Sequence, residues 1–344
     1  SGVAGASGEA LTTGSCNVVL GNGALKLNTT ASNNVAVGTL AMGANTTGSE
    51  NVAIGKCALV TNTTASNNVA IGEIALRVNT TGASNTAVGR GTLTANTTAS
   101  CNTAVGTSAA AATTTGCRNV AVGAGALKTN TEGDNNVAIG REALGVATTA
   151  DNNVAIGMDS LQANTTGHDN IAVGCGALFS NTTAPDNIAV GYQSQYNTTT
   201  GCQNVSMGWQ SMVLNTTGDG STAVGFKALY CNNGSTPDYN VAIGRQAMYS
   251  NTTGTVDTAV GINAMYSNTT GANNTAVGRN SLYANTTGSD NTAYGSEALR
   301  LATTAASNVA VGRQAMCKTT TGANNTTTGA FSLCANTCLL YTSD

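Results

Sequence analysis

The side chains that most often carry catalysis are sparse in this sequence. His168 is the only histidine among 344 residues, and it lies in a variable turn segment. No Ser/His/Asp arrangement, zinc-protease motif or Cys-x-x-Cys pair is present. We therefore expect a protein that is not an enzyme and needs no cofactor, with His168 as an ordinary surface residue.

Four aspartates are candidate ligands for a weak calcium site. Asp134 and Asp151 are 17 residues apart, and so are Asp169 and Asp186. In a chain that repeats every 17 residues, each pair would place two like charges about 4.8 Å apart, so a cation or water would have to separate them. The interpretation that we favour needs no metal: Asp replaces Asn in a hydrogen-bonded ladder.

The ten cysteines allow disulfides if the protein is extracellular. Cys317 and Cys334 occupy the same repeat position, which predicts Cα atoms about 4.8 Å apart, within the disulfide range. Cys101 and Cys117 fall at adjoining positions of successive repeats. We expect at least one disulfide between adjacent repeats. Five other cysteines have no evident mate: Cys16, Cys57, Cys175, Cys202 and Cys231.

These spacings belong to a 17-residue repeat with the consensus N-[VT]-A-[VI]-G-x-x-A-L-x-x-N-T-T-[GA]-x-x. We number its positions 1 to 17 from the first Asn. About nineteen copies run from Asn17 to the copy that begins at Asn325, with one two-residue insertion between Ser221 and Asn240. Val, Ile or Thr alternates with Ala, then Gly and N-T-T-G follow, which predicts strand, turn, short strand, turn. Stacked copies predict an all-β, parallel β-solenoid (β-roll).

The solenoid should occupy residues 17–338. Residues 1–16 are expected to be a degenerate N-terminal cap or preceding coil. Residues 339–344 leave the repeat and are typical of translated adapter sequence, so we expect a non-repeat, artefactual tail. The sequence has no initiator Met and no signal peptide, so we expect a mature form or a fragment.

Composition argues against two classes of partner. Only 8% of residues are charged, and 13 basic residues stand against 16 acidic ones, so no electrostatic footprint for nucleic acid is evident. No apolar run approaches the roughly 20 residues that span a bilayer, so we expect no membrane insertion.

Positions within the repeat predict both the core and self-association. Gly is invariant at position 5, which indicates positive φ or close backbone approach. We expect the core to be a Leu/Met column at position 9 against columns of Val, Ile and Ala, with Asn ladders at positions 1 and 12. Because position 3 is nearly always Ala, the strand is interpreted as buried on both faces. That restriction predicts burial against further copies, in a side-by-side homotrimer.

The repeat N-V-A-I-G-x-x-A-L-x-x-N-T-T-G, as in residues 51–65 and 153–167, resembles the shaft repeats of phage-type tail fibres. It is similar, more distantly, to the β-roll heads of trimeric autotransporter adhesins, whose repeat is shorter than 17 residues. The resemblance covers residues 17–338. It implies a parallel homotrimer that serves as a shaft or receptor-binding surface, located extracellularly on a virion or a cell-surface appendage.

Two alternative uses of the Asn-Thr-Thr columns are open. A flat Thr column at Thr29, Thr46 and Thr63 and onward suggests a secreted β-solenoid filament or an ice-binding solenoid, although ice-binding arrays usually use Thr-x-Thr. Asn-Thr-Thr is also a glycosylation sequon, so a column of glycans is an alternative to a turn ladder in a secreted eukaryotic protein. Such sequons include Asn28, Asn45, Asn62, Asn251 and Asn285.

The scarce aromatic residues fall in columns. Tyr192, Trp209 and Phe226 hold position 6 on successive repeats. Position 10 is held by Phe179, Tyr196, Tyr230, Tyr249, Tyr266 and Tyr283. Exposed aromatic columns are typical of surfaces that contact sugars or partner chains. We expect a recognition surface for cell-surface glycans or a receptor, or a lateral-packing surface whose rings fill a groove beneath a neighbouring chain.

Overall fold

The computed structural model describes residues 10, 12–234 and 238–335, and its contacts divide the chain into two units, residues 1–170 and 171–344. Each unit is a parallel β-solenoid, and the described residues form no helix. The predicted fold class is therefore confirmed. The tail at 339–344 and most of the cap at 1–16 lie outside the described residues.

Each coil contributes one three-residue strand at positions 2 to 4. In the first unit the strands are β1 (Val18–Leu20), β2 (Val35–Val37), β3 (Val52–Ile54), β4 (Val69–Ile71), β5 (Thr86–Val88), β6 (Thr103–Val105), β7 (Val120–Val122), β8 (Val137–Ile139) and β9 (Val154–Ile156). In the second unit they are β10 (Ile171–Val173), β11 (Ile188–Val190), β12 (Val205–Met207), β13 (Thr222–Val224), β14 (Val241–Ile243), β15 (Thr258–Val260), β16 (Thr275–Val277), β17 (Thr292–Tyr294), β18 (Val309–Val311) and β19 (Thr326–Thr328). A helix with the length and hydropathy of a membrane span is absent from the described part of the chain.

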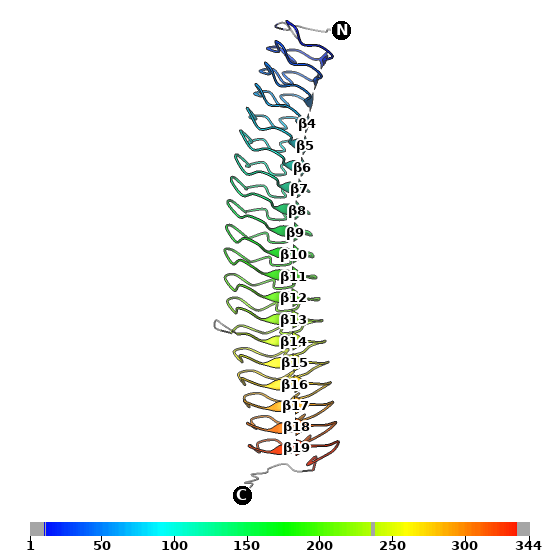
Figure 1. The fold of residues 1–344 in the computed structure, drawn as a ribbon, viewed down its shortest axis with the longest axis vertical. Helices are drawn as coiled ribbons and strands as arrows, with labels where there is room; N and C mark the ends of the chain where they lie inside the picture. Colours follow the sequence, from blue (N-terminus) through cyan, green and yellow to red (C-terminus); the bar gives the residue numbers. More distant parts are fainter. Residues whose placement is uncertain (1–9, 11, 235–237, 336–344) are drawn as a thin grey trace. The chain divides into compact units, whose positions relative to one another are not determined.

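Within each unit, successive strands pair in parallel and in register. Val52 of β3 pairs with Val69 of β4, one repeat later, and Figure 1 shows the strands of a unit lying one above another. The two-residue insertion does not disturb this order, because Thr222 of β13 still pairs with Val241 of β14. The insertion therefore lies between these two strands, in a segment of which residues 235–237 are outside the described part.

The expected second short strand is wrong: in the described coils, positions 6 to 11 form turns. Position 7 and position 9 both have a left-handed backbone, as at Cys57 (φ 55°) and Leu59 (φ 52°). The Leu59 N–H still donates to Ala75 of the next coil at 2.9 Å, but the Ala58 N–H turns back to Gly55 of its own coil. Amides such as that of Ala58 bond within their own coil and not to a neighbouring coil, so this segment makes no continuous strand ladder.

The core prediction is right for the Leu/Met and Ala columns and wrong for the Val and Ile columns of the strand. Leu59 and Ala53 are fully buried, whereas Ile54 beside Ala53 is 39% exposed. Positions 2 and 4 thus point outward and position 3 points inward, against the Leu/Met column. The coil is thin, so only a small side chain fits beneath the sheet. The core therefore explains why position 3 is restricted to Ala. The restriction does not show that the strand is buried against a neighbouring chain.

Two buried asparagine ladders complete the core. The Asn51 N–H donates to Asn34 Oδ1 at 2.9 Å, and Asn51 Nδ2 donates to the Ala65 carbonyl at 2.9 Å. Asn62 Nδ2 donates to the same carbonyl at 2.9 Å and to Asn45 Oδ1 at 2.8 Å. These four asparagines have no exposed surface. Their amides satisfy turn backbone that would otherwise be buried without partners.

Candidate functional site

The position 6 aromatics form an outward stack in the second unit. Tyr192 and Trp209 have ring centroids 5.8 Å apart, and Trp209 and Phe226 have centroids 5.1 Å apart. Each residue is a little over 40% exposed. The equal spacing follows from the repeat, since identical positions on successive coils lie one above another.

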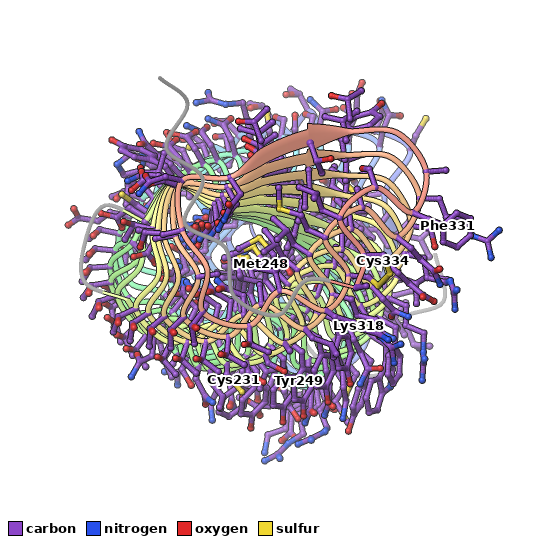
Figure 2. All side chains as sticks on the ribbon, turned by 90° about the horizontal axis from the view of Figure 1, so that it is seen from below. Cys231, Met248, Tyr249, Lys318, Phe331 and Cys334 are labelled. Atoms are coloured by element: carbon purple, nitrogen blue, oxygen red, sulfur yellow. A yellow bond between two sulfur atoms is a disulfide. The ribbon has the colours of Figure 1, made fainter. Side chains whose placement is uncertain are left out.

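The position 10 aromatics form two further stacks, interrupted by Val213. Phe179 stacks on Tyr196 with centroids 4.8 Å apart. Four tyrosines stack at 5.1–5.3 Å: Tyr230, Tyr249, Tyr266 and Tyr283. Figure 2 shows Tyr249 at the outer rim of the coil and Met248 inside it. Burial among these rings raises the pKa of the Tyr249 hydroxyl.

Stacking decides which part of each ring a ligand can reach. Within a stack the rings are nearly parallel, with interplanar angles of 4–16°. Each inner ring therefore has a neighbouring ring against both faces and shows solvent only its edge. A sugar packs best on a ring face, so within the stacks the faces available for it are at the ends.

A lysine joins the two columns. Lys227 Nζ lies 5.2 Å from the Trp209 ring centroid, 5.7 Å from that of Phe226 and 5.0 Å from that of Tyr230. The Arg245 guanidinium lies 5.8 Å from the Phe226 centroid. These distances are within the cation–π range. Positions 6, 7 and 10 therefore form one continuous surface.

All basic residues of the second unit lie on this side of the coil, at positions 6 to 11. They are Lys227, Arg245, Arg279, Arg300, Arg313 and Lys318. Glu297 is the only acidic residue at these positions in that unit, and its carboxylate accepts from Arg279 and Gln314, both at 2.8 Å. The Gln314 hydrogen bond, with the nearby arginines, lowers the pKa of Glu297. We call these six cations and the nine stacked rings the basic aromatic face.

Sequence reasoning found the rings of this face and missed its charge. Totals of 13 basic and 16 acidic residues are close to balance, which hides the segregation. Tabulating charge by repeat position would have shown it, because the other acidic residues of the second unit lie outside positions 6 to 11.

A small groove opens at one end of the tyrosine stack. It has a volume of about 200 Å³ and is lined by Asn263, Asn280, Tyr283 and Arg300. Asn263 Nδ2 donates to Asn280 Oδ1 at 3.2 Å, while Asn263 Oδ1 is buried without a donor. The groove thus combines an aromatic ring, two amides and a guanidinium.

Two of the candidate calcium ligands lie in a hydrogen-bonded ladder, but it is not the asparagine ladder that was expected. Asp134 Oδ1 accepts from the Cys117 N–H at 2.6 Å, and Asp151 Oδ1 accepts from the Asp134 N–H at 2.7 Å. Arg118 also pairs with Asp134. This is an acceptor ladder at position 16, where other coils use Ser. Within the described residues, no group of three or more His, Cys, Asp or Glu side chains could hold a metal ion.

The remaining two aspartates do not extend that ladder. Asp169 pairs with the His168 ring at 2.8 Å on the surface. Asp186 belongs to the second unit and, like Asp169, has a left-handed backbone at position 17.

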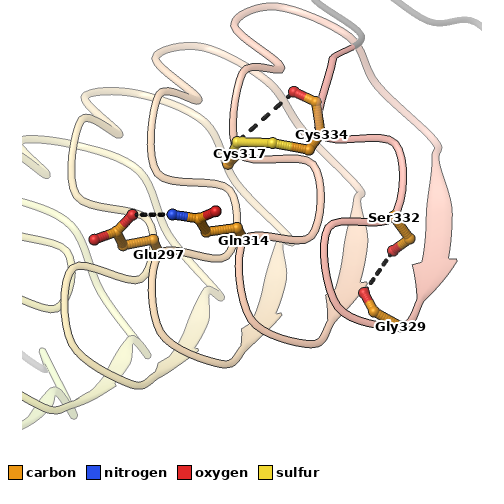
Figure 3. Close-up of a disulfide and its surroundings, with 6 residues drawn as sticks. All are labelled: Glu297, Gln314, Cys317, Gly329, Ser332 and Cys334. Atoms are coloured by element: carbon orange, nitrogen blue, oxygen red, sulfur yellow. Dashed lines mark hydrogen bonds between the residues drawn. A yellow bond between two sulfur atoms is a disulfide. The ribbon is translucent and has the colours of Figure 1, made fainter.

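One of the two candidate disulfides is present. Cys317 and Cys334 are joined, with Cα atoms 4.9 Å apart (Figure 3). Cys101 and Cys117 are both free, so that pairing is wrong. They lie in adjacent columns rather than in one: Cys117 sits above Ser100, whose N–H donates to its Sγ at 3.4 Å, and Cys101 has a left-handed backbone.

Replacing Cys317 with Ser should lower the free energy of unfolding of the second unit by about 3 kcal/mol, because the bond closes a short loop of the unfolded chain. Cys231→Ser, at a free cysteine, is the matched control and should have little effect. Alkylation without reductant, followed by peptide mass mapping, should leave Cys317 and Cys334 unlabelled. Labelling of both would contradict the bond.

The sequon asparagines cannot carry glycans in this fold. Asn28, Asn45 and Asn62 have no exposed surface, and the Nδ2 atom of each donates a hydrogen bond. Asn251 and Asn285 are buried in the same way. The turn-ladder interpretation accounts for these sequons.

The threonine column offers only one outward row. At position 13, Thr46 Oγ1 donates to the Thr63 carbonyl of the next coil at 3.0 Å, so this hydroxyl is used inside the solenoid. At position 14, Thr47 is exposed. A flat ice-binding array usually presents two rows, so the geometry does not favour ice binding.

Comparison with models of known protein families finds no match for this chain. No curated protein is similar enough in sequence to count as a relative.

Proposed function

We propose that the chain is a structural and adhesive segment of an extracellular fibre, without enzymatic activity, that assembles side by side as a homotrimer. The observation that carries this proposal is the outer face of the sheet. In almost every coil it presents half-exposed Val, Ile or Thr at positions 2 and 4, as at Ile54 (39% exposed) and Ile243 (40% exposed). We call this strip the outer strand face.

The outer strand face matches a second copy of the same chain better than any other partner. Its apolar side chains recur once per coil, in register, within each unit. A partner that buries all of them must repeat with the same period, and another copy of this solenoid does. Burying one such side chain would contribute about 1 kcal/mol, and the contribution recurs along the stack.

Two further observations support an extracellular, non-enzymatic role. The Cys317–Cys334 disulfide is typical of an oxidising compartment. The asparagine side chains of the coil interior, as at Asn51 and Asn62, donate to turn carbonyls and so have a structural role. The resemblance to tail-fibre and adhesin repeats is compatible with this role.

The proposal predicts that the chain sediments as a trimer. Introducing charge on two adjacent coils of the outer strand face, with Ile54→Lys and Ile71→Lys together, should dissociate it. Tyr192→Ser, Trp209→Ser and Phe226→Ser together form the control, because these rings lie on the basic aromatic face and should not affect assembly. Sedimentation equilibrium at several concentrations measures both. A wild-type chain that stays folded and monomeric at high concentration would show the proposal to be wrong.

A further inference from the structure

The groove beside Tyr283 lies at the end of the four-tyrosine stack. The next residue of the position 10 column is basic. One face of Tyr283 lies against Tyr266, with centroids 5.3 Å apart. On the next coil, position 10 is Arg300 rather than a ring. The second face of Tyr283 is therefore not covered by an aromatic neighbour, and it can take the C–H face of a pyranose ring.

Arg300 supplies a guanidinium that makes no salt bridge among the described residues, although it is close enough to Glu297 to help lower the pKa of that carboxyl. The nearby acidic side chain, Glu297, already accepts from Arg279 and Gln314. A guanidinium binds a carboxylate best in a bidentate geometry, so Arg300 selects for an acidic group on the ligand.

The two amides add hydrogen-bonding capacity at the floor of the groove. Asn263 donates to Asn280 and leaves its own Oδ1 without a donor. Both residues line the groove, so their amide groups can bond the hydroxyls of a ligand. The volume of about 200 Å³ is below the roughly 300–1,000 Å³ of sites for drug-sized ligands, so it suits a single sugar ring.

We infer that this groove binds one carboxylated sugar unit of an anionic surface glycan. The inference rests on the adhesive part of the proposed function and names its ligand class. Tyr283 packs against the sugar ring, Arg300 binds its carboxylate, and the Asn263–Asn280 pair binds its hydroxyls. Arg279, Arg313 and Lys318 lie on the same face and extend the positive charge for neighbouring units of the glycan.

The test uses the full chain and two probes that differ in one group, methyl β-glucuronide and methyl β-glucoside, titrated by saturation-transfer NMR. We expect a Kd of about 1–10 mM for the glucuronide, as for a small ligand with few contacts, and binding of the glucoside about tenfold weaker. Arg300→Gln should abolish this tenfold preference. Tyr283→Val should weaken the binding of both probes equally, by about the same tenfold factor.

Both substitutions are compatible with the fold, because other coils carry Gln162 and Val213 at position 10. Arg245→Gln removes a guanidinium of the same face that lies beside Phe226 and does not line the groove, so it should leave both Kd values unchanged. Sedimentation run in parallel separates the two proposals. A monomer overturns the proposed assembly. This inference is overturned if the assembled chain binds no glucuronide at 50 mM, a chosen upper limit of about ten times the expected Kd.

Two competitors complete the test. Inorganic phosphate that displaces the glucuronide with equal affinity would reduce the groove to a simple anion site and overturn the sugar assignment. A single-stranded oligonucleotide that binds more tightly than an oligoglucuronide of equal charge would overturn it in favour of nucleic acid.

Discussion

Replacing Gly38 with Ala should destabilise the first unit by about 3–5 kcal/mol, by combining backbone strain with overpacking. Gly38 has φ of +130°, a conformation that side chains rarely adopt, and a Cβ there would lie 2.7 Å from the Gly55 carbonyl oxygen. The obstacle is backbone of the next coil, which cannot rotate away. The same geometry recurs at position 5 of other coils, as at Gly55 and Gly312, so these glycines should be equally intolerant, whereas a Cβ at Gly329 would meet nothing closer than 3.9 Å.

Gly43→Ala, in the same coil, is the matched control. A Cβ at Gly43 would meet its nearest atom at 3.4 Å, and other coils carry larger residues at this position 10, such as Val60. We expect no loss of stability, or a gain of about 0.4–1 kcal/mol from reduced freedom of the unfolded chain. Because solenoids unfold in segments, amide hydrogen exchange in coils 34–67 is the appropriate measurement. Equal effects of the two substitutions would contradict the close-approach argument.

Replacing Asp257 with Asn should stabilise the second unit by about 4 kcal/mol above pH 7. Asp257 takes the place of Asn at position 1 and is fully buried. Its carboxyl accepts from the Asn274 N–H at 2.7 Å and from Asn268 Nδ2 at 3.0 Å. Burial raises its pKa from 3.8 to about 7. Each pKa unit corresponds to about 1.4 kcal/mol, which sets the size of the effect.

The sign follows from proton binding. Between pH 3.8 and about 7 the folded chain holds a proton that the unfolded chain has lost. Stability from this residue is therefore complete below pH 3.8, falls as the pH rises, and is lost once the pH passes about 7. Asn carries no such dependence. Hydrogen exchange of coils 240–273 across this pH range should show the slope in the wild type and not in Asp257→Asn, whereas Asp151→Asn, in the first unit, should leave exchange in these coils unchanged.

The repeat made much of this fold predictable. Its period places identical positions above one another, which is why the Cys317–Cys334 bond and the stacking columns could be expected before any coordinates. The adjacent-column pair Cys101 and Cys117 shows the limit of that argument, since neighbouring positions in one coil can face different ways. Their relative direction depends on backbone angles that spacing does not encode.

Alternation alone did not predict which face of the strand is buried. A period of two shows that Ala53 and Ile54 face opposite sides, but it does not say which side is the core. The larger residue is usually the buried one, and here it is not, because Leu59 reaches across the coil and leaves room only for a small side chain. Leu59 itself has a left-handed backbone, which is uncommon for residues other than Gly, Asn and Asp. Tertiary packing overrides local preference at both positions.

The asparagine ladders also give each unit an electrical direction. Asn45 Nδ2 points to Asn28 of the preceding coil, while Asn45 Oδ1 accepts from Asn62 of the following one. The amide dipoles of a row therefore align and add, as peptide dipoles do along a helix. Wherever such a stack ends, its N-terminal edge presents amide hydrogens and its C-terminal edge presents carbonyl oxygens. Two stacks can then join end to end only head to tail, so the side-chain rows impose a polarity on any longer assembly of these coils.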